Sequence, residues 1–69
     1  MRISARNQLA GTIVAVSPGA VTTMVKVRLA GGDLVTSSIT KEAAEELGLA
    51  VDSPVVVVVK ASDVMLVVD

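Results

Sequence analysis

Alternation of apolar and polar residues dominates the chain. It is clearest at residues 21–29, where four aliphatic residues and one threonine hold the odd positions and mostly polar residues hold the even ones. A period of two predicts a β-strand with one buried face. β-Branched stretches bounded by Gly, Pro, Asp or Ser predict four further strands. These lie at residues 9–16, 34–39, 55–60 and 64–68.

One helix is predicted among these strands. Residues 41–47 are rich in Ala and Glu, Thr40 suits the N-cap, and Gly48 suits the left-handed position that ends a helix. Five short strands with a helix between the third and fourth follow the element order of an OB-like barrel. We therefore predict an all-β fold, an OB-like five-stranded barrel with one short helix between strands 3 and 4. Residues 1–69 are expected to form a single domain.

The composition indicates that this domain assembles with copies of itself. The chain is 52% hydrophobic without any aromatic residue, and its mean hydropathy is +0.74. A domain of 69 residues buries only about 60% of the surface that its unfolded chain exposes. The five consecutive valines at residues 55–59 further indicate a strand that is covered on both faces. We expect a homo-oligomer, because one small chain cannot hide this much apolar surface.

Charge and residue usage exclude several classes of function. The net charge is −1 and the pI is near 5.1, which does not indicate a nucleic-acid-binding surface. His and Cys are both absent, so disulfides and catalysis by these residues are excluded, as are imidazole and thiolate metal ligands. No apolar run approaches the ~20 residues of a membrane span or forms a secretory signal. The expected location is the cytoplasm.

Few residues suggest catalysis or cation binding. Lys60 could activate Ser4 or Ser62, but no motif supports a Ser–Lys pair. Three glutamates lie close together in the predicted helix and are more typical of a solvated helix face than of a cation site: Glu42, Glu45 and Glu46.

Three other polar features could together bind an anion. They are the cluster SARNQ at residues 4–8, Lys60 at the end of the valine strand, and the helix start at Thr40. Free amides at a helix start, an Arg and a Lys would complete an oxyanion pocket. Spacing does not show that the three features meet. Lys60 also suits a solubilising residue at a strand end, and the N-terminal cluster also suits a disordered start.

The combination of motifs adds a family resemblance. The runs ISARNQL at residues 3–9 with GT at 11–12, ELGL at 46–49 and VKASDVM at 59–65 resemble those of the molbindins, the Mop-type molybdate-binding proteins. The similarity covers nearly the whole chain. It implies an OB-like barrel, a hexamer built as a trimer of dimers, and cytoplasmic storage and homeostasis of molybdate or tungstate.

The resemblance also implies a site at a subunit interface. Ser4, Arg6, Lys60 and the Ala61 amide would come from one chain, and the helix start at Thr40 from its neighbour. Such a site holds the intact oxyanion by charge-assisted hydrogen bonds, with no bare metal cation and no catalytic residue. Ala43 and Glu46 stand where other family members can carry further donors.

Two alternative functions come from other classes. An OB-type nucleic-acid-binding module would need stacking aromatic residues and a basic groove, and this sequence has neither. A purely structural interaction module would use the apolar faces for assembly while the basic residues only aid solubility.

Overall fold

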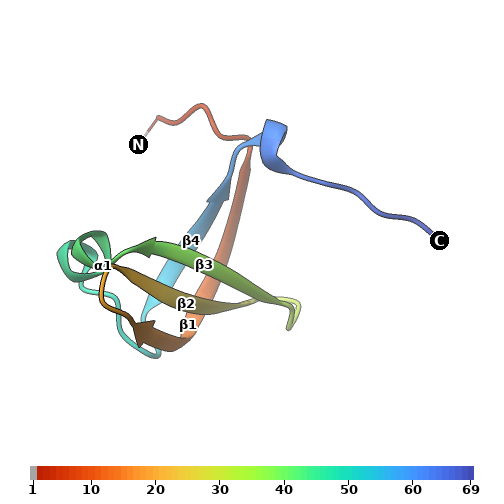
Figure 1. The fold of residues 1–69 in the computed structure, drawn as a ribbon. Coiled ribbons are helices and arrows are strands. Elements are labelled where there is room, and N and C mark those ends of the chain that lie inside the picture. Colours follow the sequence, from red (N-terminus) through yellow and green to blue (C-terminus); the bar gives the residue numbers. More distant parts are fainter. Residues whose placement is uncertain (1) are drawn as a thin grey trace.

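The computed structural model describes residues 2–69. Four strands and two short helices follow one another along the chain (Figure 1). They are β1 (Asn7–Pro18), β2 (Thr22–Leu29), β3 (Leu34–Thr40), α1 (Lys41–Leu47), β4 (Pro54–Val59) and the 3₁₀ helix η1 (Ala61–Asp63).

The strands form one curled antiparallel sheet in the order β3-β2-β1-β4. β2 and β3 are a hairpin, as the sequence pattern predicts. β1 is the central element, because its first half pairs with β4 and its second half pairs with β2. Gly11 and Thr12 have a partner on each side. The long β1 therefore joins the two parts of the sheet and directs β4 away from the hairpin (Figure 1).

Two features of β1 allow this curl. The register with β2 shifts between Ile13 and Ala15, and such a bulge bends a strand. At Gly11 the neighbouring chain comes so close that a Cβ atom would lie 2.6 Å from Val27 Cγ1 and 2.7 Å from the Arg28 carbonyl oxygen. Only glycine fits this approach without a shift of its neighbours.

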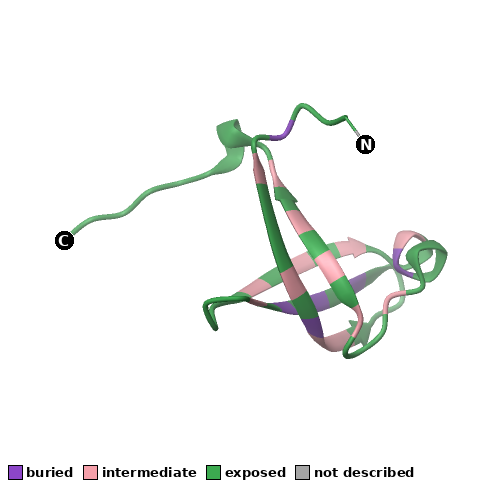
Figure 2. Cartoon of the chain, turned by 180° about the vertical axis from the view of Figure 1, so that it is seen from behind, coloured by how far each residue is buried: buried purple, intermediate pink, exposed green. Residues whose placement is uncertain are grey.

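The core of the chain is small. Ile13, Val25 and Val27 form its buried centre, in the region where β1 crosses β2 (Figure 2). Six half-buried residues pack against that centre: Val16, Leu29, Ile39, Leu49, Val55 and Val57. The inward-facing valines of β4 are thus only partly covered, and Val56 and Val58 on its other face are 53% and 45% exposed.

The helix forms as predicted. The Thr40 hydroxyl accepts a hydrogen bond from the Ala43 amide at 3.1 Å, and Gly48 adopts φ 63° and ψ 37°. Both ends of α1 are therefore capped by the residues that the sequence indicates.

The predicted fifth strand is not formed. Residues 61–63 are a 3₁₀ turn, and residues 64–69 then extend away from the body without a strand partner (Figure 1). Met65, Leu66, Val67 and Val68 are each at least 91% exposed. A segment with a strand-like pattern forms a strand only where a sheet edge is available for pairing. Residues 64–69 extend away from the sheet after η1, so no edge of their own chain is within reach. The five-stranded barrel is therefore not confirmed, and the structure is a curled sheet of four strands.

Candidate functional site

The pairing of β1 with β4 brings two predicted site residues together. This ladder runs from Thr12 opposite Pro54 to Asn7 opposite Val59. Arg6 directly precedes Asn7 and Lys60 directly follows Val59, so the two residues flank the final pair of the ladder. The two cations come from sequence positions far apart, and the antiparallel ladder places them at the same end of the sheet.

A side-chain hydrogen bond reinforces that end of the ladder. Asn7 Nδ2 donates to the Val59 carbonyl oxygen at 3.2 Å, and the contact is partly buried. Lys60 follows in an extended conformation, with φ −65° and ψ 135°. The turn after it is closed by the Asp63 amide, which donates to the Lys60 carbonyl oxygen at 2.9 Å.

The candidate residues around this end are open to solvent, and we call them the β1–β4 site: Ser4, Arg6, Lys60 and Ala61. Ala5, which lies between Ser4 and Arg6, is only 8% exposed, whereas both of its neighbours are exposed. Within residues 2–69 neither Arg6 nor Lys60 forms an ion pair with a carboxylate. Two positive charges at the same end of a ladder would be neutralised by an anion bound between them, since Arg and Lys form charge-assisted hydrogen bonds to oxyanions.

Thr40 does not join the β1–β4 site within one chain. It pairs with Thr22 at the last register position of the β2–β3 hairpin, next to α1, whereas Lys60 follows the far end of β4 (Figure 1). Two of the first helix amides already have partners, because Lys41 donates to the Val21 carbonyl at 2.9 Å and Ala43 donates to Thr40. The Thr40 hydroxyl hydrogen remains as a donor for a ligand.

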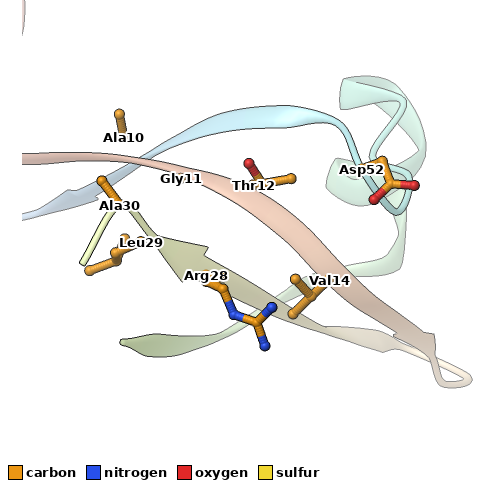
Figure 3. A pocket seen from close by; sticks show the side chains of 8 residues that line it. All are labelled: Ala10, Gly11, Thr12, Val14, Arg28, Leu29, Ala30 and Asp52. Atoms are coloured by element: carbon orange, nitrogen blue, oxygen red, sulfur yellow. The ribbon is translucent and has the colours of Figure 1, made fainter. Parts of the chain in front are cut away.

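A separate groove has a volume of 490 Å³ and contains none of the predicted site residues. It lies over β1, the end of β2 and the loop before β4 (Figure 3). Its polar side chains are Thr12, Arg28 and Asp52, and sequence reasoning did not select them. Asp52 adopts a positive φ of 75° in that loop, and its amide donates to the Ile13 carbonyl at 2.8 Å. Because the groove is lined by a carboxylate as well as a cation, it is poorly suited to a divalent anion.

An apolar groove of 170 Å³ lies on the open side of the curled sheet. Its walls come from β2, β3, the last residue of α1, the segment after α1, and β4: Val25, Val27, Ser37, Ile39, Leu47, Leu49, Val55, Val56, Val57 and Val58. β3 and β4 are the two edges of the sheet order, so this groove lies where a further strand would close it.

Residues 2–69 contain neither a cluster of metal ligands nor a helix that could span a membrane. No group of three or more Asp, Glu, His or Cys side chains could hold a metal ion, and Glu42, Glu45 and Glu46 are exposed. No helix in the same range has the length and apolar character needed to cross a bilayer.

Comparison with known proteins places the chain in a family. The family model described as "TOBE domain" matches residues 3–66. Molybdenum-pterin-binding protein 3 of Clostridium pasteurianum is 48% identical over 66 residues, which cover 96% of this chain and 97% of that protein.

Solved structures have the same fold. MopII from Clostridium pasteurianum superposes with a TM-score of 0.91 at 43% identity, covering 97% of this chain and 100% of MopII. The cytoplasmic molybdate-binding protein ModG, in a molybdate-bound form, gives a TM-score of 0.91 at 46% identity and covers 94% of this chain and 46% of ModG. The chain therefore belongs to the TOBE domain family and is a homologue of the single-domain Mop molybdenum-pterin-binding proteins.

Proposed function

We propose that this chain binds molybdate or tungstate as an intact tetrahedral dianion, in a pocket shared by two copies of the chain. The observation that supports the proposal is the final register pair of the β1–β4 ladder, Asn7 opposite Val59, because Arg6 directly precedes Asn7 and Lys60 directly follows Val59. The name of molybdenum-pterin-binding protein 3 and the name and molybdate-bound state of ModG support the choice of ligand.

The charges of the β1–β4 site match this ligand. Arg6 and Lys60 supply two positive charges without a carboxylate partner among residues 2–69, which equals the charge of one MoO₄²⁻ or WO₄²⁻ ion. Arg offers a planar fork of N–H donors and Lys a flexible ammonium, and both form short charge-assisted hydrogen bonds to oxyanions. The Ser4 hydroxyl and the Ala61 amide would donate to the remaining oxygens. A dianion leaves water at low cost only where several such donors replace its hydration.

A second copy would supply the rest of the pocket. The residues of the β1–β4 site are exposed in the single chain, and Thr40 lies at the end of the hairpin next to α1. We propose that the Thr40 hydroxyl of a neighbouring copy closes the pocket. Donors from two chains would surround the anion and exclude water from it.

The surface of the chain supports assembly. Its accessible area is 5470 Å², whereas a compact monomer of 7.0 kDa exposes about 4,000 Å². The excess includes the apolar tail at residues 64–68 and the outward-facing valines of β4. The unfilled groove between β3 and β4 offers unpaired strand edges and an apolar floor for such a tail from a second copy. We propose that the fifth strand of the barrel is completed in this way, in a homohexamer arranged as a trimer of dimers.

The biological role that fits such a protein is storage and homeostasis of the oxyanion in the cytoplasm, without catalysis. ModG, a relative with the same fold, is a cytoplasmic protein by name. Hydrogen bonding without covalent attachment allows the anion to be released unchanged when its free concentration falls.

Calorimetric titration tests the proposal. Molybdate and tungstate are each titrated into the protein at physiological salt, with chloride as the control anion and light scattering on the same samples. We expect binding in the micromolar range or tighter, by particles of several subunits. Absence of heat with both oxyanions would refute the proposed function.

A structural interaction module is the second candidate, because the exposed tail and the apolar groove alone would favour assembly. The same experiment separates the two functions. Multi-subunit particles that give no heat with either molybdate or tungstate would support the interaction module.

A further inference from the structure

We propose that the side chain of Asn7 is a positioning residue that holds Arg6 and Lys60 at the spacing needed for the anion. This inference rests on the proposed function and adds to it a residue that does not touch the ligand.

The hydrogen bond from the Asn7 side chain joins β1 to the end of β4. Its amide nitrogen reaches the carbonyl oxygen of Val59, 52 residues away, at the last register pair of the β1–β4 ladder. Arg6 precedes Asn7 directly, and Lys60 follows Val59 directly. One contact therefore joins the two backbone segments that carry the two cations.

The ladder alone would hold this end weakly. Strand ends fray, since the last pair has neighbours on only one side. Arg6 and Lys60 add two like charges directly beyond that pair, and like charges close together favour separation of the strands in the absence of an anion. A partly buried side-chain hydrogen bond opposes both effects. The empty site would thereby keep its two cations together and lose less entropy when the anion binds.

Asn is well suited to this position. Its short side chain carries two N–H donors, so it can reach across to the neighbouring strand while its backbone remains in the ladder. Gln8, the next residue, pairs with Val58 and is exposed. No hydrogen bond from the Gln8 side chain forms within residues 2–69, although it carries the same amide group. Gln8 is therefore a matched control for Asn7.

The test is a double-mutant cycle on molybdate affinity at a temperature well below unfolding. Asn7→Ala is compared with Gln8→Ala in the wild-type background and in a Lys60→Ala background. Light scattering confirms equal assembly, and far-UV circular dichroism confirms folding. We expect Asn7→Ala to weaken binding by roughly 2- to 12-fold, the equivalent of one net hydrogen bond. Gln8→Ala is expected to change affinity by less than about twofold, since it removes no such bond.

The double-mutant cycle distinguishes a role of Asn7 in positioning Lys60 from a role in stabilising the fold alone. If Asn7 acts by placing Lys60, Asn7→Ala should have almost no further effect once Lys60 has been removed. Asn7→Asp keeps the shape but lacks the donor, so it should also weaken binding, and by more than the equally charged control Gln8→Glu.

Three results are informative. Equal affinities of Asn7→Ala and wild type, or a full additional loss in the Lys60→Ala background, would overturn the positioning role while leaving the proposed function intact. A wild-type protein that fails to bind molybdate would instead refute the proposed function and with it this inference.

Discussion

Removal of the Arg6 guanidinium is the most direct perturbation of the β1–β4 site. Arg6→Ala leaves Lys60 as the only cation opposite a dianion, and no carboxylate in residues 2–69 rearranges, because Arg6 has no ion-pair partner there. A unit charge about 4 Å from a dianion at an effective dielectric constant of about 20 gains roughly 8 kcal/mol before desolvation is subtracted.

The net loss is smaller than this Coulomb energy. Removal of one partner from a desolvated, hydrogen-bonded charge pair costs about 2–5 kcal/mol, so the dissociation constant for molybdate should rise roughly 30- to 5,000-fold. Arg6→Lys keeps the charge but loses the two-pronged donor and should lie between wild type and Arg6→Ala. Isothermal titration calorimetry measures all three proteins.

Arg28→Ala is the matched control for this experiment. It removes the same charge from an exposed position on β2, beside the groove that contains Asp52. We expect its molybdate affinity to stay within about twofold of wild type. The reasoning fails if Arg6→Ala binds molybdate within threefold of wild type, or if the two Arg→Ala variants lose affinity equally.

Four further predictions follow from the fold and the proposed assembly. Gly11→Ala should reduce the free energy of unfolding by about 1–3 kcal/mol through overpacking, and the Tm measured by circular dichroism should fall by roughly 5–20 °C. Gly31→Ala is the control, because no atom lies within 4 Å of its added Cβ, and it should not lower Tm. Deletion of residues 64–69 should reduce particle mass in light scattering, and an unchanged mass would contradict the role of the tail. Thr40→Ala should lose about 0.5–2 kcal/mol of helix capping in urea denaturation, whereas Thr40→Ser should keep most of it. Molybdate at about 100 times its Kd should add about 2.7 kcal/mol of stability, and an unchanged Tm would contradict specific binding to the folded state.

Much of the local structure could be predicted from the sequence. The period-two pattern identified β2 and its buried face, since Thr23, Val25 and Val27 are all buried. The caps of α1 also follow from local chemistry, because Thr40 and Gly48 act on neighbouring backbone groups only. These features depend on residues close in sequence, where residue type constrains the geometry directly.

Pairing between distant segments could not be predicted in the same way. β1 is longer than the predicted residues 9–16, because its first residues pair with β4 and its last ones with β2. Residues 64–68 carry a strand pattern as strong as that of β4, yet they form no strand. Hydrophobic alternation indicates that a segment can form a strand, but it does not specify the sheet edge with which that strand pairs.

In the candidate site, too, residue chemistry could be predicted from the sequence, whereas the pairing of distant segments could not. Residue chemistry alone indicated Arg6 and Lys60 as anion donors, but only the pairing of β1 with β4 brings them to the same end of the sheet. The Asn7 contact had no signal in the sequence beyond its place in the SARNQ cluster. A side-chain donor that reaches a carbonyl 52 residues away depends entirely on tertiary structure.

The proposed assembly and the proposed anion binding share one short segment of this chain. Lys60 and Ala61 belong to the β1–β4 site, and the exposed tail begins only a few residues later, after η1. The turn is held by the bonds from the Asp63 amide to the Lys60 carbonyl and from the Val64 amide to the Ala61 carbonyl. A change in the direction of the tail therefore acts on the same backbone that presents the Lys60 ammonium. If the tail docks on a second copy and the anion binds at the interface, each event stabilises the conformation that the other requires. Linkage then requires the molybdate affinity to rise with assembly by the same factor as molybdate strengthens the assembly.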